Sequence, residues 1–223
     1  MRYRPPVPAP DVVPPGDRRW LGLGLAAGPV AFVSAWAIGG ARTPGYSPVH
    51  DAISRLAAIG APSRPLMTAG FVAYGAAVLV GSATLRRSFL ARAVPAVVVN
   101  GLATWAVAAL PLDRSDGGDV AHGVAATVGY VSLAAVPALA AGPLARQGHR
   151  WAARVSVAAA VAIGACLVLT TVADAKGLAQ RTGLGLGDVW LIVAGVALAA
   201  GTLEPAASTT PVDGTVDSGS ERP

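Results

Sequence analysis

Hydrophobic residues dominate six long runs of this chain. The runs cover residues 20–40, 65–85, 93–112, 120–144, 151–173 and 183–203. A helix needs about 20 apolar residues to cross a hydrocarbon layer of about 30 Å, because each residue advances it by about 1.5 Å. Each run is close to that length. The pattern therefore predicts an all-α, polytopic integral membrane protein with six transmembrane helices in one bundle.

Polar residues, prolines and glycines fill both ends of the chain. Residues 1–19 are rich in proline, which disfavours a helix, and residues 204–223 are polar. We expect two disordered cytoplasmic tails around a transmembrane domain at residues 20–203. A cleavable signal peptide is the alternative interpretation of the first run, because arginines precede it and residues 35–37 read AWA. The run is, however, longer than the usual apolar part of such a peptide.

Composition supports a membrane protein and excludes several other classes. The 223 residues are 53% hydrophobic and only 13% charged, with a mean hydropathy of +0.55, against about 25% charged residues in a typical soluble domain. The net charge of +5 does not indicate nucleic-acid binding, because the basic residues are scattered through short loops. We expect membrane lipid as a partner and no nucleic acid. The single Cys166 excludes an intrachain disulfide.

Basic residues predict the orientation of the six runs. Eleven Lys and Arg residues lie on the side of the two termini and six on the opposite side. Cytoplasmic loops carry the excess of positive charge, so we expect both termini in the cytoplasm. The bias is moderate, and an inverted bundle remains the alternative.

One polar stretch, GYSPVHDAIS at residues 45–54, interrupts the apolar sequence after the first run. Ser47 followed by Pro48 is typical of a helix start. We expect a short interfacial helix over residues 47–58, with an apolar stripe on one side. Its other side would carry Ser47, His50, Asp51, Ser54 and Arg55, next to Tyr46.

Other polar residues gather on the same side of the membrane. Asp113 ends the third run, and Asp119 and His122 share one helix face at the start of the fourth. Asp188 lies 15 residues before Leu203, which places it about 8 Å inside the hydrocarbon core. A charged residue at that depth should face the bundle interior. The alternative for Asp119 and Asp188 is a simple helix-capping role.

These residues suggest a site on the extracytoplasmic side. The catalytic candidates are Ser47, His50, Asp51, Asp113, His122 and Asp188, and the binding candidates are Tyr46, Ser54, Arg181 and Trp190. Imidazole and carboxylate groups near a low-dielectric boundary suit acid–base chemistry. They could also hold a divalent metal such as zinc, for which the candidates are His50, Asp113, Asp119 and His122. The sequence identifies no other cofactor.

Three motifs resemble a known bacterial family. They are residues 39–71, the pair formed by residues 111–113 and 121–123, and residues 177–191. Together they resemble the six-helix membrane proteins grouped as domain of unknown function 998. The resemblance spans residues 20–203 and implies six spans, a polar first loop and a location in the bacterial inner (plasma) membrane. It implies no activity. Gln180 stands where the family pattern has an acid before Arg181.

Three function classes follow from these features. The residue types favour a small membrane enzyme or binding protein that acts on a lipid, such as a hydrolase or transferase. A transporter or channel for a small molecule is the second class, although the expected polar residues lie near one face and not at the midplane. A non-catalytic structural or accessory subunit is the third. A converged polar cluster would favour the enzyme or binding protein, a continuous polar path would favour the transporter, and separated helix caps that face outward would favour the structural subunit.

Overall fold

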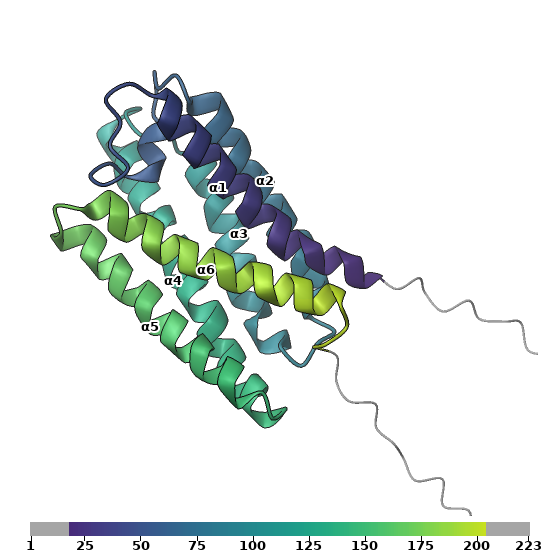
Figure 1. Cartoon of the computed structure of the whole chain (residues 1–223). Helices are drawn as coiled ribbons and strands as arrows, with labels where there is room; N and C mark the ends of the chain where they lie inside the picture. Colours follow the sequence, from purple (N-terminus) through teal and green to yellow (C-terminus); the bar gives the residue numbers. More distant parts are fainter. Residues whose placement is uncertain (1–17, 204–223) are drawn as a thin grey trace, which may run out of the picture.

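Six long helices form one bundle (Figure 1). The computed structural model describes residues 18–203, and the predictions for residues 1–17 and 204–223 lie outside the described part. The elements, with 3-10 helices written η, are η1 (Arg18–Leu23), α1 (Gly24–Arg42), η2 (Ile53–Ala57), α2 (Arg64–Leu85), η3 (Ala91–Ala93), α3 (Val94–Ala109), α4 (Asp116–Arg146), α5 (Arg150–Val172) and α6 (Lys176–Ala199).

All six α-helices are long and apolar enough to cross a membrane. Both ends of the described chain lie at one end of the bundle, whereas η2 lies at the opposite end (Figure 1). Helices suit this environment because they satisfy every backbone N–H and C=O group within the segment. Proline stands at the first or second position of α2 and α3. Pro29 lies inside α1, and Pro137 and Pro143 lie inside α4, as membrane helices tolerate.

Five of the six runs match their helices to within a few residues, but the sixth prediction was wrong at its start. Helix α6 begins at Lys176, seven residues before the expected boundary. The polar segment GLAQRTGLGLGD is helical because its backbone groups bond to one another, while Gln180 and Arg181 bond to the preceding loop and Asp188 is buried. Asp188 is therefore twelve residues from the first residue of α6 and eleven from the last.

The segment between α1 and α2 differs from the expected continuous helix. Residues 48–50 form a turn and Ile53–Ala57 form the 3-10 helix η2. Ser47 and Asp51 close the turn, since Ser47 N donates to Asp51 Oδ2 (2.7 Å) and Asp51 N donates to Ser47 O (2.7 Å). Ala52 then adopts an extended backbone, with φ −64° and ψ 148°, and this breaks the helix.

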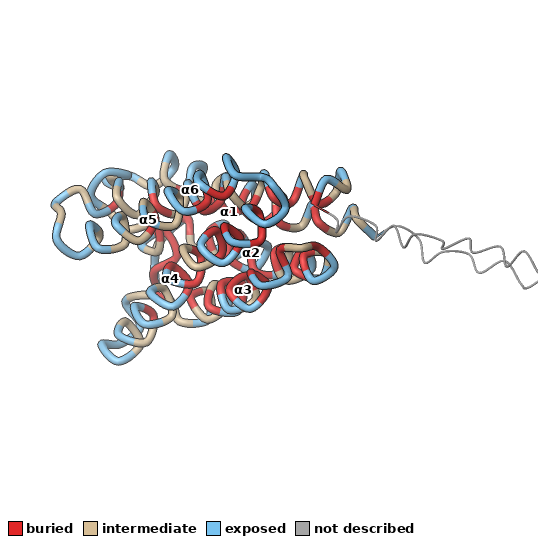
Figure 2. The backbone as a smooth tube through the Cα atoms, turned by 90° about the horizontal axis from the view of Figure 1, so that it is seen from below, coloured by how far each residue is buried: buried red, intermediate tan, exposed pale blue. Residues whose placement is uncertain are grey.

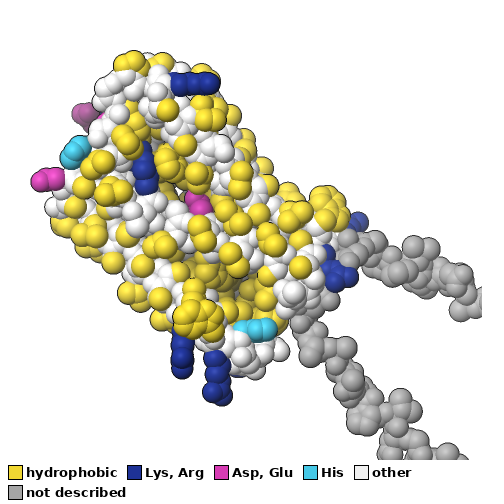
Figure 3. Space-filling model, viewed as in Figure 1, with side chains coloured by type: hydrophobic (Ala, Val, Ile, Leu, Met, Phe, Trp, Pro, Cys, Tyr) yellow, Lys and Arg dark blue, Asp and Glu magenta, His cyan; other side chains and the backbone are white. Residues whose placement is uncertain are grey.

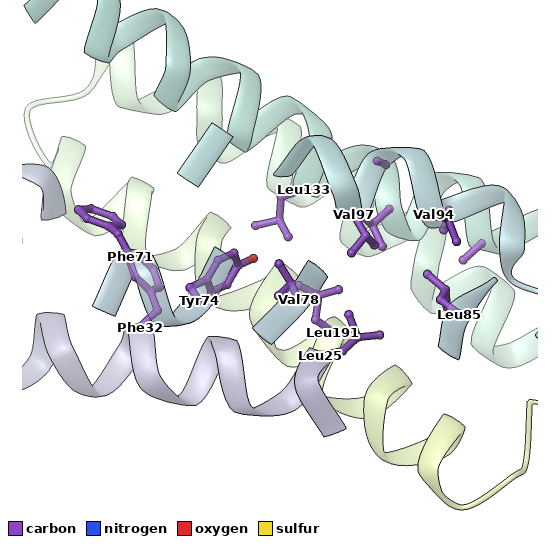
Figure 4. Close-up of a cluster of buried hydrophobic side chains, with 14 of the residues drawn as sticks. Leu25, Phe32, Phe71, Tyr74, Val78, Leu85, Val94, Val97, Leu133 and Leu191 are labelled. Atoms are coloured by element: carbon purple, nitrogen blue, oxygen red, sulfur yellow. The ribbon is translucent and has the colours of Figure 1, made fainter. Parts of the chain in front are cut away.

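Apolar side chains fill the bundle from the level of the aromatic residues to the terminal end. Leu25, Val78 and Leu191 from three different helices are 0–1% exposed and meet in the interior (Figure 4). Buried residues line the inner faces of the helices and exposed residues the outer faces (Figure 2). Hydrophobic side chains dominate the middle of the outer surface, and most basic side chains lie toward its ends (Figure 3). Such a surface suits contact with lipid.

Candidate functional site

Arg181 fastens the loop after α1 onto the start of α6. We call residues 46–57 the cap. Arg181 Nη1 donates to Pro48 O (2.7 Å) and Asp51 O (2.9 Å), and Nη2 donates to the Tyr46 hydroxyl. The guanidinium also lies over the rings of Trp36 and Tyr46, 5.3 and 5.4 Å from their centroids. This arginine therefore joins α1, the cap and α6.

Two further hydrogen bonds hold the cap against α6. Leu178 N donates to Val49 O (2.9 Å). This amide is free to do so because it lies in the first turn of α6 and has no carbonyl partner within the helix. Gln180 Oε1 accepts from Ile53 N (2.8 Å). A neutral amide is sufficient for this bond because its partner is a backbone N–H. The departure of Gln180 from the family pattern therefore still allows a bond between the cap and α6.

The corner between α3 and α4 contacts the cap from its other side. Asp113 has a positive φ of 62°, and its N–H donates to Asp119 Oδ1 (2.9 Å). Arg55 Nη1 lies 2.9 Å from Asp113 Oδ1, with side chains 50% and 43% exposed. Such an exposed pair contributes little to stability. Ser115, and not Asp119, caps α4 by accepting from Gly118 N.

His50 and Ser47 lie on the outer surface of the cap. Ser47 Oγ accepts from His50 N (3.3 Å), and His50 Nδ1 lies 3.2 Å from Asp174 O. Burial raises the pKa of the Tyr46 hydroxyl, and the neighbouring Arg181 charge opposes part of that rise. These contacts give the three residues structural roles in the cap.

A cavity of about 160 Å³ lies inside the bundle beneath the cap. It extends from η2 to Asp188, the midpoint of α6, and all six helices contribute to its wall. Its polar lining residues are Ser54, Tyr74, Asn100, Thr104, His122, Thr127, Tyr130, Thr170, Gln180 and Asp188.

Asp188 is the deepest ionisable group of this cavity. It is 3% exposed, so the prediction that it faces the bundle interior is confirmed. The alternative that Asp188 caps the N-terminus of its helix was wrong, because the residue lies in the middle of α6. The expected hydrogen bond to Arg181, His122 or Tyr46 is also not formed, because Asp188 Oδ2 is buried without a partner among the described residues.

His122 supplies a second buried group to the cavity wall. It is 4% exposed, and its Nδ1 lies 2.6 Å from Leu110 O. A carbonyl oxygen only accepts, so Nδ1 carries the proton in this bond. Nε2 of the neutral ring is then an acceptor, and it is buried without a hydrogen-bond partner in the described part of the chain.

Three helices share a buried hydrogen-bond chain beside the cavity. Tyr74 Oη donates to Asn100 Oδ1 (2.8 Å), and Asn100 Nδ2 donates to Gly129 O (2.8 Å). The prediction that Asn100 bonds a neighbouring helix is confirmed. Sequence reasoning missed Tyr74 and Tyr130 as lining residues. Both are polar residues within apolar runs, and their position far from the ends of these runs was the one available signal.

The candidates from the sequence thus separate into three groups. Ser54, His122 and Asp188 line the cavity. Trp190 lies elsewhere, since its Nε1 donates to Ser156 Oγ (2.9 Å) between α6 and α5. The remaining candidates, Tyr46, Ser47, His50, Asp51, Asp113, Asp119 and Arg181, belong to the cap and its contacts. Within residues 18–203, no three His, Cys, Asp or Glu side chains are grouped as a metal would require, so no three of the metal candidates His50, Asp113, Asp119 and His122 come together.

Six apolar helices around a polar interior define a multi-pass membrane protein. The chain belongs to the family described as "Protein of unknown function (DUF998)", whose model matches residues 26–197. This match agrees with the resemblance drawn from the sequence motifs. No curated protein matches the chain. No solved structure matches it either.

Proposed function

We propose that this protein is a carrier that takes a small polar solute from the extracytoplasmic side to a site at the middle of the membrane. The observation that carries the proposal is Asp188, a buried carboxylate at the midpoint of α6 with an oxygen that has no hydrogen-bond partner. An ionisable residue at this depth is costly and marks a path for ions or substrates. Carriers bind their substrates near the midplane.

The two halves of the bundle differ as a carrier requires. The cavity reaches from η2 to Asp188. Beyond Asp188, the buried side chains of Leu25, Val78 and Leu191 close the interior toward the terminal end. An apolar closure on one side of a central site is the arrangement expected of one state in alternating access. The excess of basic residues beside the termini supports an extracytoplasmic position for the cap.

A lipid hydrolase or transferase has less support. A nucleophilic hydroxyl needs a base within hydrogen-bond reach, and within residues 18–203 no serine or threonine hydroxyl bonds a histidine or carboxylate side chain. The cavity volume of about 160 Å³ is also below the range of about 300–1,000 Å³ that is usual for drug-sized ligands. A small solute fits better than a lipid.

Thiol labelling tests the proposal. In a Cys166→Ala background, Ala126→Cys places a thiol in the cavity wall, and Val128→Cys places one on the exposed face of the same helix. A carrier should allow a small charged methanethiosulfonate to label Ala126→Cys from outside in intact cells and from inside in inverted vesicles. Val128→Cys should stay unlabelled, because lipid excludes a charged reagent. Labelling of Ala126→Cys from one side only, or from neither, would contradict a carrier.

A further inference from the structure

The threonine hydroxyls of the cavity wall already donate their protons within the protein. Three threonines donate to carbonyls of their own helices: Thr104 to Asn100 O (2.9 Å), Thr127 to Gly123 O (2.8 Å) and Thr170 to Leu167 O (2.6 Å). A hydroxyl that donates its single proton can offer a ligand only its oxygen lone pairs. These three side chains therefore present acceptors to the cavity.

The deeper groups repeat this pattern. Tyr74 donates to Asn100 Oδ1, and the Asn100 amide donates to Gly129 O. Tyr130 Oη lies 3.5 Å from Gln180 O, at the distance limit of a hydrogen bond. The donors that remain for a ligand are the hydroxyl of Ser54, which belongs to the cap, and the amide of Gln180, which bonds to the cap at Ile53. The inner part of the cavity is consequently rich in acceptors and poor in donors.

Two acceptors in this cavity have no partner within the described residues. They are Asp188 Oδ2 and His122 Nε2, each on a side chain more than nine-tenths buried. Among the described residues, no lysine or arginine lines the cavity, and Arg181 directs its guanidinium to the cap. A buried carboxylate without a counter-charge is costly. A positively charged ligand would remove that cost, whereas an anionic ligand would increase it.

Aromatic rings form the apolar part of the wall. The rings of Phe71 and Tyr74 each lie 5.6 Å from that of Phe32, measured between centroids, and all three residues line the cavity. Ring faces attract cations and also accommodate short hydrocarbon chains. A bare metal ion is less suitable, because no group of three metal-ligating side chains exists in residues 18–203. The lining therefore combines a charge partner with an apolar surface.

The volume limits the size of the ligand. A cavity of about 150 Å³ in another protein holds benzene, with about six non-hydrogen atoms, and the present cavity is about 160 Å³. We propose that the solute is a small primary alkylammonium ion, with its –NH₃⁺ group on Asp188 Oδ2 and its hydrocarbon chain against Phe32, Phe71 and Tyr74. This inference rests on the proposed function, because it assigns the solute of the same cavity.

Equilibrium binding to the full chain in lipid nanodiscs tests the ligand class. The probes are n-butylammonium, 1-butanol and butyrate, which share one chain and differ in charge. Butylammonium should bind at least about tenfold more tightly than butanol, and butyrate should bind most weakly. This comparison uses the wild-type protein, so it does not depend on the folding of any variant. Equal affinity for the three probes, or a preference for butanol or butyrate, would overturn the proposal.

Matched variants test the assigned carboxylate. Asp188→Asn should weaken butylammonium binding at least about tenfold while leaving butanol binding unchanged. Asp116→Asn removes an exposed carboxylate from the first turn of α4 and should change neither. Unchanged butylammonium binding in Asp188→Asn would overturn the assignment.

The outcomes for the ligand and for the carrier can be separated. Tight butylammonium binding without two-sided labelling of Ala126→Cys would retain the ammonium site and reject the carrier. Two-sided labelling without a preference for butylammonium would retain the carrier and reject the ligand class.

Discussion

Replacement of Arg181 by methionine should release the cap while the bundle stays folded. Methionine keeps an unbranched apolar side chain and removes the three donors that reach Pro48 O, Asp51 O and the Tyr46 hydroxyl. A hydrogen bond to a charged group contributes about 1.5–3 kcal/mol. Because Arg181 is partly exposed and water can reach the freed carbonyls, we expect a smaller total, of about 2–4 kcal/mol. The change should appear as local opening of the cap.

Amide hydrogen exchange of the protein in nanodiscs measures this opening. A loss of about 2–4 kcal/mol corresponds to about 30- to 700-fold faster exchange, at about 1.4 kcal/mol per factor of ten. The acceleration should be confined to residues 46–57 and should include the Ile53 amide, which donates to Gln180. Arg181→Lys should fall between wild type and Arg181→Met, because an ammonium keeps the charge but loses the planar geometry of the guanidinium.

Arg87→Met is the matched control, because Arg87 is an exposed arginine in the loop between α2 and α3. Its exchange should equal that of wild type. Cap amides that exchange within about threefold of wild type in Arg181→Met would refute the energetic role of the arginine. Equal acceleration in α2 and α3 would refute its local character, since the whole bundle would then be opening.

Two further predictions concern orientation and helix packing. In a cysteine-free background, Arg114→Cys should react with an impermeant thiol reagent on intact cells and Arg87→Cys should not, since the basic residues favour the terminal side as cytoplasmic; the reverse result would invert the bundle. Gly195→Ala should lower the melting temperature by costing about 1–3 kcal/mol, because its Cβ would lie 2.7 Å from Gly22 O. Gly185→Ala, with open space at its Cβ, should not lower the melting temperature. Equal melting temperatures for the Gly195→Ala and Gly185→Ala variants would refute the packing argument.

The membrane architecture was predictable because the bilayer restricts what a chain can do within it. Long apolar runs have to form helices, and five of the six runs identified the described helices closely. The sixth failed because the prediction relied on hydrophobicity alone. Gln180 and Arg181 are polar residues in the first turns of α6. Gln180 accepts a hydrogen bond from the cap, and Arg181 donates to it. Tertiary contacts therefore extend a helix beyond its apolar run.

The cavity was less predictable than the cap. The cap residues are crowded into one short stretch of sequence, GYSPVHDAIS, whereas the polar cavity residues are dispersed along η2 and five helices. Thr104, Thr127 and Thr170 give no signal of their own, because threonine satisfies its hydroxyl on its own helix and is common in apolar segments. Only the packing of the helices shows that their oxygens face one space.

The starting residue of α6 decides which function class the polar residues support. A start at residue 183 would place Asp188 near the helix end, where a capping role or a surface site is reasonable. The observed start at Lys176 adds seven residues, or about 10 Å of helix, and moves Asp188 to the midpoint. At that depth a carboxylate can no longer reach bulk water by side-chain extension. It needs either a proton or a positively charged partner, and no lysine or arginine within residues 18–203 lines the cavity. A cation that enters from outside the protein satisfies this requirement, and for that reason a change in one helix boundary favours a carrier over an enzyme at the membrane surface.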